Sequence, residues 1–567
     1  MSRQPLVRLT LGLILWISAL APLGAPAAVR AAPSGAMVVA ANPLAAEAGR
    51  KVLERGGDAV DAAVAVQAVL GLVEPQSSGV GGGAFMTFYD ARTGKVTAYD
   101  GREAAPAAAT PRFFLKPDGM PIPFFEAIMS GRSTGPPGAI GMLGLAHRQH
   151  GRLAWSVLFD DARRLASDGF EVSPRLAGFV ATPFPQARAP DVVAYFTKPD
   201  GTEVKAGDLL KNPAYARTLA TIASEGAGAL YRGPIAADIV RRVDRDPGGV
   251  LSLEDMQAYR PLASDALCRP YRLYLVCVPP SPSGGPALLE MLGLLERTDI
   301  DHRGPDDPKA WFEMVQAMRL TYVDRDRYLG DPAFVNEPVA GLLSPAYLDQ
   351  RARLIGEVAG PEPPAGMPPG AVGAGADATR EAGGTSHFVV IDRQGNVVSM
   401  TTSVESVFGS GRMVDGFVLN NQLTDFSFQP TDSQGRPAAN AVAPGKRPRS
   451  AMTPVIVLDR QGRFVAALGS PGGPAILAYD LKALVGVLDW KLSMQRAIAL
   501  PNLIAIGDRF AGETGKFAPA VVKGLADRGV AFTEGRGENS GLHGVMVRDG
   551  VLQGGADPRR EGVVLAY

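Results

Sequence analysis

The sequence predicts an α+β fold, because segments with the pattern of helices alternate with segments that have the pattern of β-hairpins. Helical spacing of apolar residues occurs at 44–54 and 59–72, whereas short apolar runs separated by turns occur at 85–100 and 388–402. Apolar residues make up 46% of the chain, which excludes a disordered protein. The 567 residues suffice for one large core or several small ones.

Local signals place the elements of the first half. The first helix follows Asn42-Pro43, a capping residue and a helix-opening proline, and ends at Gly56-Gly57. A second helix is expected at 59–72, and a hairpin joins strands at 85–90 and 95–100 through the turn at 91–94. The region from about 145 to 350 is richer in helical pattern, with Pro and Gly breaks near 180–200 and 279–286.

The second half begins with a segment of low complexity. Residues 361–384 are mostly Pro, Gly and Ala, and we interpret them as a flexible linker that does not pack. Strands at 388–391 and 397–402 follow, joined by the turn at 392–396. Strands are expected to dominate to about residue 468, before helices at 475–488 and 494–499 and short C-terminal strands. We find no internal repeat.

Residues 1–31 have the composition of a signal peptide. Arg3 and Arg8 precede an apolar run at 11–20 that is too short to span a bilayer, and small residues follow it. A retained membrane anchor is the less favoured alternative. We therefore expect a periplasmic or secreted protein. The 57 basic and 57 acidic residues balance, so no overall charge favours nucleic acid.

Two cysteines, Cys268 and Cys277, flank a short segment that has the pattern of a hairpin. Facing strands in an oxidising compartment would permit a disulfide, and two buried free thiols are the alternative. Neither interpretation makes these residues catalytic.

The histidines do not indicate a metal site. His147 and His150 stand three residues apart on a predicted helix, but no carboxylate completes a zinc set, and we expect no metal or cofactor. We interpret His387 as a buried polar residue. The run Gly79-Val80-Gly81-Gly82-Gly83 lacks the Lys of a phosphate-binding loop, so we interpret it as a place of close backbone packing.

The threonine that follows the linker indicates chemistry. The linker brings Thr385 to the edge of a sheet, and cleavage of the Gly384–Thr385 bond would give Thr385 a free α-amine beside its own hydroxyl. Such an amine has a pKa of about 8 and can act as a base near neutral pH. Taken alone, the site is more often an ordinary exposed Gly-Thr loop.

The chain around Thr385 resembles the processing site of the γ-glutamyltransferase family of N-terminal-nucleophile (Ntn) hydrolases. The resemblance runs from about residue 36 to 567, and it is carried by motifs that occur in the family's order, at 43–49, 56–63, 74–83, 100–103, 419–426, 446–452 and 469–473. It implies a four-layer αββα sandwich, the Ntn-hydrolase fold, built after self-cleavage from a large subunit of residues 32–384 and a small subunit of residues 385–567. The two subunits would form a heterodimer.

The resemblance also assigns a role to each site residue. Thr385 matches the nucleophile, and Gly472 and Gly473 match the backbone donors of an oxyanion hole. The substrate-binding residues are implied as Arg102 and Ser450 for the α-carboxylate and Gln422 and Asp425 for the α-amino group. One end of the pocket would then be cationic and the other anionic.

The chain departs from the family pattern at three residues and in one segment. Ser403 stands where the familiar transferases have Thr, and it keeps a hydroxyl near the nucleophile. Glu405 stands where many bacterial members have Asn, and Ala451 replaces the second Ser of a pair. The stretch between Asp425 and Ser450 lacks the lid tyrosine of well-known members and looks shorter, which favours hydrolysis.

The resemblance implies a γ-glutamyl hydrolase or transferase that acts on glutathione or a related compound, with water, an amino acid or a dipeptide as acceptor. Two alternatives remain. One is an acylase of the same fold that removes glutaryl-like groups, against which Glu405 and Asp425 argue, because a glutaryl group has no ammonium. The other is an unprocessed exported binding protein, which would not need both a nucleophile and an oxyanion hole.

Overall fold

The computed structural model describes Met1 and residues 35–377, 381, 383–535 and 540–567 of the uncleaved chain. The described residues from Gly35 to Tyr567 form one compact unit. The predicted signal peptide lies, apart from Met1, outside the described residues. Among the described helices, none combines the length and the apolar composition that crossing a membrane requires.

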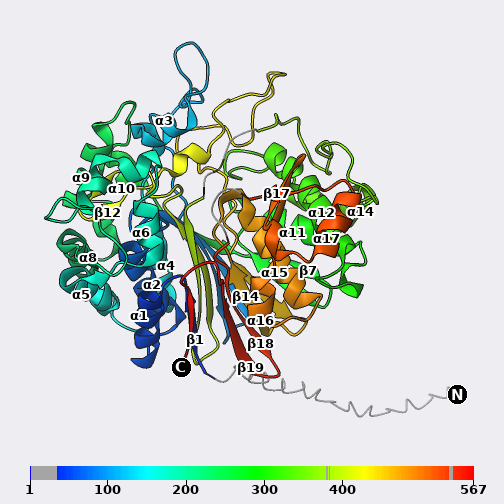
Figure 1. The fold of residues 1–567 in the computed structure, drawn as a ribbon, viewed down its shortest axis with the longest axis horizontal. Helices are drawn as coiled ribbons and strands as arrows, with labels where there is room; N and C mark the ends of the chain where they lie inside the picture. Colours follow the sequence, from blue (N-terminus) through cyan, green and yellow to red (C-terminus); the bar gives the residue numbers. More distant parts are fainter. Residues whose placement is uncertain (2–34, 378–380, 382, 536–539) are drawn as a thin grey trace. The chain divides into compact units, whose positions relative to one another are not determined.

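Two antiparallel sheets form the centre of the unit (Figure 1). The first has seven strands in the spatial order β20 (Val563–Ala566), β1 (Met37–Ala40), β9 (Thr385–Ile391), β10 (Val397–Ser403), β2 (Gly83–Asp90), β3 (Lys95–Asp100) and β6 (Leu262–Asp265). The second has six strands in the order β19 (Val551–Ala556), β18 (His543–Arg548), β14 (Phe464–Gly469), β13 (Val455–Asp459), β8 (Tyr274–Val278) and β7 (Leu267–Tyr271).

Helices cover the outer face of each sheet, so the molecule has the four layers that the family resemblance implies. The seven-stranded sheet is covered by α1 (Pro43–Glu54), α2 (Ala59–Val73) and α4 (Ala139–His150). The six-stranded sheet is covered by α11 (Gly285–Leu295), α15 (Ile476–Leu488) and α16 (Met494–Ala499). Figure 1 shows these two groups of helices on opposite sides of the strands. The expected αββα architecture is confirmed.

The remaining elements lie outside these central layers or connect them. The helices are α3 (Phe124–Met129), α5 (Asp160–Asp168), α6 (Pro174–Val180), α7 (Pro190–Tyr195), α8 (Pro213–Glu225), α9 (Gly233–Asp244), α10 (Leu253–Ala258), α12 (Pro308–Tyr328), α13 (Val339–Leu342), α14 (Pro345–Ala352) and α17 (Pro519–Asp527). The short strands are β4 (Phe170–Glu171), β5 (Leu209–Leu210), β11 (Met413–Val414), β12 (Phe417–Val418), β15 (Leu503–Ile506), β16 (Arg509–Gly512) and β17 (Thr533–Glu534).

Capping side chains explain why the first two helices begin where the sequence predicts. The Asn42 side chain accepts a hydrogen bond from the backbone N–H of Leu44 at 2.9 Å, just before α1. Asp58 and Asp61 form a reciprocal capping box at the start of α2. The predicted helices and hairpins of this region are confirmed to within a few residues.

The alternation of side chains along β9 places the predicted nucleophile between the two sheets. Val389 and Ile391 belong to the core between the sheets, whereas Phe388 and Val390 belong to the core beneath the helices. Because side chains alternate along a strand, Thr385 shares the face of Val389 and Ile391. It therefore lies at one end of the inter-sheet layer.

The expectation that Thr385 lies at the edge of a sheet is wrong. Strand β9 lies between β1 and β10, and Thr385 is only 3% exposed. The hairpin with β10 is a local pairing that the sequence predicts, whereas β1 pairs with β9 across about 350 residues of chain, with Met37 opposite Ile391. No local pattern reveals that second pairing.

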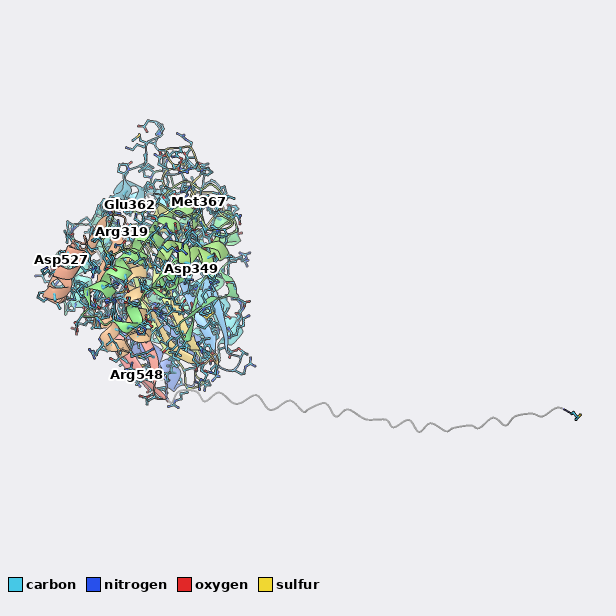
Figure 2. All side chains as sticks on the ribbon, turned by 90° about the vertical axis from the view of Figure 1, so that its right-hand side faces the viewer. Arg319, Asp349, Glu362, Met367, Asp527 and Arg548 are labelled. Atoms are coloured by element: carbon cyan, nitrogen blue, oxygen red, sulfur yellow. A yellow bond between two sulfur atoms is a disulfide. The ribbon has the colours of Figure 1, made fainter. Side chains whose placement is uncertain are left out.

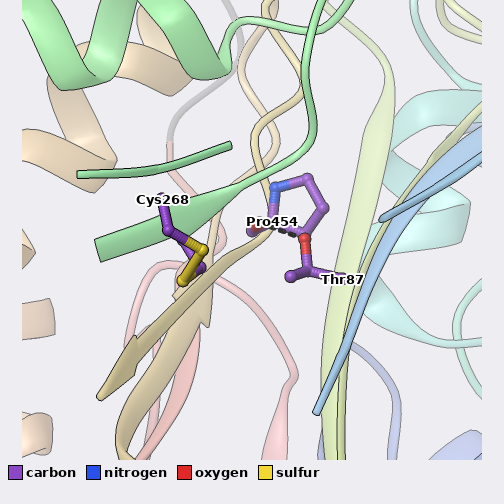
Figure 3. The surroundings of a disulfide bond; sticks show 4 residues. Thr87, Cys268 and Pro454 are labelled. Atoms are coloured by element: carbon purple, nitrogen blue, oxygen red, sulfur yellow. Dashed lines mark hydrogen bonds between the residues drawn. A yellow bond between two sulfur atoms is a disulfide. The ribbon is translucent and has the colours of Figure 1, made fainter. Parts of the chain in front are cut away.

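The two cysteines form a disulfide, and the alternative of two free thiols is wrong. Cys268 on β7 lies directly opposite Cys277 on β8, with a Cα–Cα distance of 4.1 Å. Figure 3 shows this bond near a contact between the sheets, where the Thr87 hydroxyl donates to the Pro454 carbonyl at 2.8 Å.

The described part of the Pro- and Gly-rich segment packs against helices, so the prediction that residues 361–384 do not pack is wrong for residues 361–377. The backbone N–H of Gly366 donates to Asp324 at 2.6 Å, and the Tyr328 hydroxyl donates to the Gly366 carbonyl at 2.6 Å. Arg351 donates to the Pro364 carbonyl at 3.0 Å. Figure 2 labels Glu362 and Met367 of this segment. The Met367 and Val372 side chains of this segment are exposed, and the segment is thus held largely through its backbone.

Candidate functional site

Thr385 and Ser403 face each other at the ends of two paired strands. Thr385 is the first residue of β9 and Ser403 the last of β10, and the two are direct cross-strand partners. The Thr385 hydroxyl donates to Ser403 Oγ at 3.0 Å, and Ser403 Oγ donates to the Gly384 carbonyl at 2.9 Å. A chain of two hydrogen bonds therefore joins the predicted nucleophile to the carbonyl of the bond that it would cleave.

Neighbouring backbone groups hold Ser403 and Gly384 in these hydrogen bonds. The backbone N–H of Glu405 donates to Ser403 Oγ at 2.8 Å. A Cβ atom on Gly384 would lie 2.4 Å from the Glu405 carbonyl oxygen, which is closer than any side chain can approach. Gly82 meets the same constraint, because its Cβ would lie 2.1 Å from the Ser403 carbonyl oxygen. The prediction of close backbone packing at residues 79–83 is thus confirmed.

Arg560 holds the nucleophile from the other side, and sequence reasoning missed it. This residue lies between β19 and β20, and its Nη1 donates to the Thr385 carbonyl at 3.0 Å. Its side chain passes over Gly541, whose Cβ would lie 2.4 Å from Arg560 Nε. The contact joins the C-terminal part of the chain to Thr385.

Gly472 and Gly473, the predicted oxyanion donors, lie on the loop that follows β14. A Cβ on Gly469, the last residue of β14, would lie 2.4 Å from His387, which places the start of this loop beside a residue two positions from Thr385. Gly472 has φ +135° and Gly473 has φ +56°, and a Cβ on Gly472 would lie 2.6 Å from the ring of Tyr479. Glycine suits both backbone conformations.

His387 is a buried polar residue, as the sequence predicts. Its ring nitrogen Nδ1 lies 2.9 Å from the Thr401 hydroxyl. Burial lowers the pKa of His387 well below its usual value, and the imidazole is therefore neutral. Histidine is not needed as the base if the α-amine of Thr385 takes that role.

Arg102 is fully buried and its guanidinium is surrounded by acceptors. It donates to the Pro448 carbonyl at 3.1 Å and to the Arg449 carbonyl at 2.8 Å. It also pairs with Asp425 at 2.5 Å and donates to the Gln422 side chain. Because Arg102 and Glu103 are both buried, they do not form an ion pair on the surface.

The expected separation into a cationic and an anionic end is wrong for the uncleaved chain, because Arg102 and Asp425 are in direct contact. The α-carboxylate and α-ammonium of an amino acid are attached to one carbon. Groups that bind both must therefore adjoin, and the Arg102–Asp425 pair meets that requirement. Gln422 connects this pair to the nucleophile, since its Nε2 donates to the Ser403 carbonyl at 3.1 Å.

Glu405 and Asp425 share a hydrogen bond beside Arg102. Burial, and then the charge of Asp425, raises the pKa of Glu405 well above its usual value. Glu405 therefore carries a proton that it donates to Asp425. Although burial alone would lower the pKa of Arg102, the neighbouring carboxylates raise it, so the guanidinium stays charged. An ammonium group could replace the shared proton.

Ser450 lies next to the backbone that holds Arg102. Its N–H donates to the Pro282 carbonyl at 2.8 Å, and its hydroxyl oxygen accepts from the N–H of Met452 at 3.1 Å. Ala451 has no hydroxyl to add. Ser450 thus directly follows Arg449, whose carbonyl accepts from Arg102.

Sequence reasoning also missed a buried cluster of charged residues that adjoins this site. Arg325 on α12 pairs with Glu381 of the linker at 2.6 Å and with Asp326 at 2.8 Å. Arg449 lies 3.1 Å from Asp326, 3.0 Å from Asp377 and 3.6 Å from Glu381. These residues come from three separate parts of the sequence, and no local pattern distinguishes them from solvated charges.

The other candidate sites are structural. His147 Nε2 lies 3.0 Å from the Leu153 carbonyl oxygen, which anchors a loop. No group of three or more His, Cys, Asp or Glu residues within the described ranges is arranged to hold a metal ion.

Comparison with known proteins gives a consistent result. The Gamma-glutamyltranspeptidase family matches residues 45–567. The chain is 37% identical over 484 residues to the glutathione hydrolase proenzyme of Bacillus subtilis strain 168, covering 82% of this chain and 80% of that protein. It is 34% identical over 540 residues to the glutathione hydrolase proenzyme of Escherichia coli K12, covering 92% and 90%.

A solved structure covers nearly the whole chain. The cephalosporin acylase from Bacillus halodurans superposes with a TM-score of 0.84 at 27% identity, over 98% of this chain and 99% of that chain. The match of the family to nearly all of the sequence, together with these relatives, settles the assignment. This chain belongs to the gamma-glutamyltranspeptidase family.

Proposed function

We propose that this chain is a self-cleaving γ-glutamyl hydrolase and transferase that acts on glutathione and related γ-glutamyl compounds. The observation that carries the proposal is the hydrogen-bond chain from Thr385 through Ser403 to the Gly384 carbonyl. The relatives named as glutathione hydrolase proenzymes support both the substrate class and the cleavage.

Self-cleavage begins when Thr385 Oγ1 attacks the Gly384 carbonyl carbon. Ser403 accepts the hydroxyl proton and donates its own hydrogen bond to the carbonyl oxygen as negative charge develops there. The C–N bond then breaks, the proton passes to the Thr385 nitrogen, and an ester joins Gly384 to Thr385 Oγ1. Water hydrolyses that ester, which leaves a carboxylate on Gly384 and a free α-amine on Thr385.

The freed Thr385 then repeats the attack on a substrate. Its amine takes the proton from its own hydroxyl, and Oγ1 attacks the γ-carbonyl of the substrate. The backbone N–H groups of Gly472 and Gly473 stabilise the tetrahedral oxygen. The leaving amine departs with a proton, and water or an acceptor amine opens the γ-glutamyl ester.

The head of the substrate is bound by the network around Arg102. Arg102 and Ser450 would bind the α-carboxylate, and Asp425, Glu405 and Gln422 would bind the α-ammonium. The ammonium displaces the proton that Glu405 shares with Asp425 and forms an ion pair with the carboxylate that the proton leaves, whereas a donor without an ammonium gains no such ion pair.

Hydrolysis should outweigh transfer. The segment between Asp425 and Ser450 has no tyrosine, and a less complete lid excludes water less well. With a γ-glutamyl donor and glycylglycine at neutral pH, free glutamate should exceed γ-glutamyl dipeptide. Predominant dipeptide would contradict the lid argument.

Export to the periplasm or the cell exterior is part of the proposal. It is supported by the composition of residues 1–31 and by the Cys268–Cys277 disulfide, because such bonds persist in oxidising compartments. Fractionation of producing cells, with the protein found only in the cytoplasm, would refute it.

A second candidate function is a glutaryl-type acylase, favoured by the likeness to the cephalosporin acylase over the whole chain. Glu405 and Asp425 argue against it, as a glutaryl group brings no ammonium to that buried pair. Comparing kcat/KM for γ-glutamyl and glutaryl anilides separates the candidates. Equal turnover would promote the acylase.

The deciding experiment is intact mass of the purified protein followed by the anilide comparison. Cleavage before Thr385 gives a small chain of about 19 kDa, by scaling 59.3 kDa to residues 385–567. A chain that begins Thr385-Ser386-His387 should be found, and Thr385→Ala should leave one chain. A wild-type protein that stays whole, or an N-terminus elsewhere, would refute the nucleophile.

The assignment of Arg102 has its own test. Arg102→Lys keeps a positive charge beside Asp425, so the chain should still fold and cleave. An ammonium cannot reproduce the guanidinium fork, and KM for a γ-glutamyl anilide should rise about ten-fold or more. Unchanged kcat/KM in the cleaved variant would exclude Arg102 from the substrate site.

A further inference from the structure

The buried charge cluster beside the substrate site contains a carboxylate from the linker. Glu381 precedes the scissile bond by three residues, and its side chain is only 9% exposed. It pairs with Arg325 at 2.6 Å and lies 3.6 Å from Arg449. A glutamate of the uncleaved chain is therefore bound between two buried guanidinium groups.

The cluster adjoins the proposed head-group site through backbone and side-chain contacts. The Arg449 carbonyl accepts from Arg102, and the Arg449 N–H donates to the Asn440 side chain at 2.9 Å. Asn440 Nδ2 in turn donates to the Asp425 carbonyl at 2.7 Å. The backbone of Arg449 thus lies beside the Arg102–Asp425 pair, and its side chain extends from there to Arg325.

Glu381 lies on the acyl side of the scissile bond, as a substrate carboxylate would. In self-cleavage Gly384 supplies the attacked carbonyl, so the residues before it lie on the acyl side, as the γ-glutamyl group does in a substrate. The charge of Glu381 also reaches the carboxyl groups of Glu405 and Asp425, where it contributes to the raised pKa of each. An α-carboxylate would lie on the same side and near the same pair.

Most N–H donors of Arg102 already have acceptors in this structure. The guanidinium groups of Arg325 and Arg449, in contrast, contact Glu381 of the linker. Arg102 donates to two backbone carbonyls and to the side chains of Gln422 and Asp425. If Glu381 leaves, Arg325 keeps Asp326, and Arg449 keeps Asp326 and Asp377, as ion-pair partners among the described residues. The Arg325 Nη2 that donated to Glu381 is then available to another anion.

We propose that Arg325 and Arg449 form an additional binding site for the substrate α-carboxylate, which Glu381 occupies in the uncleaved chain and vacates after cleavage. This inference rests on the proposed γ-glutamyl activity and adds two specificity-determining residues to it. It also makes Glu381 a positioning residue for self-cleavage, since its ion pair fixes the chain just before Gly384.

The test compares two anilide donors that differ only in the α-carboxylate. γ-Glutamyl-4-nitroanilide carries it, and 4-aminobutyryl-4-nitroanilide lacks it but keeps the ammonium. Arg449→Met should raise KM for the first about ten-fold with little change in kcat, and should leave kcat/KM for the second unchanged. Arg449→Lys should recover part of the loss, since it restores the charge.

Arg436→Met is the matched control, because Arg436 lies on the same segment but its ion-pair partner is Asp432, which is not a member of the cluster. It should behave as wild type. If Arg449→Met fails to cleave, the same comparison is made with Arg449→Lys and Arg325→Lys, both of which retain charge. An equal loss with both donors, or no loss with either, overturns the inference. A wild-type enzyme that turns over no γ-glutamyl anilide instead refutes the proposed function.

Glu381→Gln tests the other half of the proposal. Loss of the ion pair with Arg325 should slow self-cleavage about ten-fold, measured by the appearance of the two chains on a denaturing gel. Glu362→Gln, in the same linker but remote from the scissile bond in sequence, should cleave at the wild-type rate. Equal cleavage rates for Glu381→Gln and wild type would show that Glu381 does not position the linker.

Discussion

The hydroxyl of Ser403 lies between the attacking and the attacked groups of the proposed self-cleavage. It accepts from Thr385 and donates to the carbonyl of Gly384. The residue is 1% exposed, so no solvent molecule at the surface competes for these bonds. A serine here keeps the hydroxyl that the threonine of related transferases supplies.

Ser403→Ala should slow self-cleavage by about 10²–10³-fold, because it removes a donor to the carbonyl oxygen that gains negative charge. Ser403→Thr, which keeps the hydroxyl, should cleave at close to the wild-type rate. Both are measured as the fraction of two-chain protein over time. If the alanine variant cleaved as fast as wild type, Ser403 would have no part in the reaction.

The sequence could predict individual site residues only where a motif carries them. Motifs identify Thr385, Arg102, Gln422 and Asp425, and the structure joins them in one hydrogen-bond network. The pairing of Arg325 with Glu381 is different, because each residue alone looks like a solvated charge. Their burial depends on the packing of α12, the linker and residues near 449, which no local pattern encodes.

At the scale of elements, helices and hairpins were predictable because their signals are local. A few neighbouring residues specify the capped starts of α1 and α2. The same is true of the turns in the β2–β3 and β9–β10 hairpins. The order of strands was not, since β9 pairs with β1 at long range. The linker was misjudged because its anchors, such as Asp324 and Tyr328, lie on another element.

The packing of the linker gives a stability prediction with an internal control. A Cβ on Gly366 would lie 2.0 Å from the Tyr347 hydroxyl, which is itself bound to Asp324 at 2.6 Å, whereas a Cβ on Gly373 would meet nothing within 4 Å. Gly366→Ala should destabilise the chain by about 1–3 kcal/mol, and Gly373→Ala should not.

Both variants are best measured by thermal unfolding in the Thr385→Ala background, where the chain stays whole and unfolding is unimolecular. Gly366→Ala should lower Tm by several degrees. Two alanine variants with the same Tm would mean that the linker does not depend on this contact.

At the scale of the whole molecule, the layer between the sheets contains buried titratable groups. Burial lowers the pKa of His543, a residue of β18, from 6.5 to about 4. The unfolded chain therefore binds a proton there that the folded chain does not. The stability contributed by neutral His543 is complete above pH 6.5 and is lost as the pH falls from there towards about 4.

The measurement compares urea unfolding of wild type and His543→Gln between pH 7.5 and 5, both in the Thr385→Ala background. All other titrating groups are common to the two proteins, so the contributions of those that do not interact with His543 cancel. Relative to the variant, wild type should lose stability as the pH falls, with a total of about 2 kcal/mol by pH 5. A constant difference across the pH range would contradict the effect of burial.

The order of strands in the seven-stranded sheet has a consequence for the life of the enzyme. Strands β20, β9 and β10 come from the residues after Gly384, and β1 lies between two of them although it comes from the residues before. After cleavage, neither chain retains the neighbours that its strands require, and the information for folding is divided between two molecules. The uncleaved precursor can fold as a single chain. Refolding of the denatured mature enzyme requires the large and the small chain to associate. The lifetime of the active enzyme is therefore governed by its rate of unfolding, because two chains that have unfolded and separated rarely reassemble.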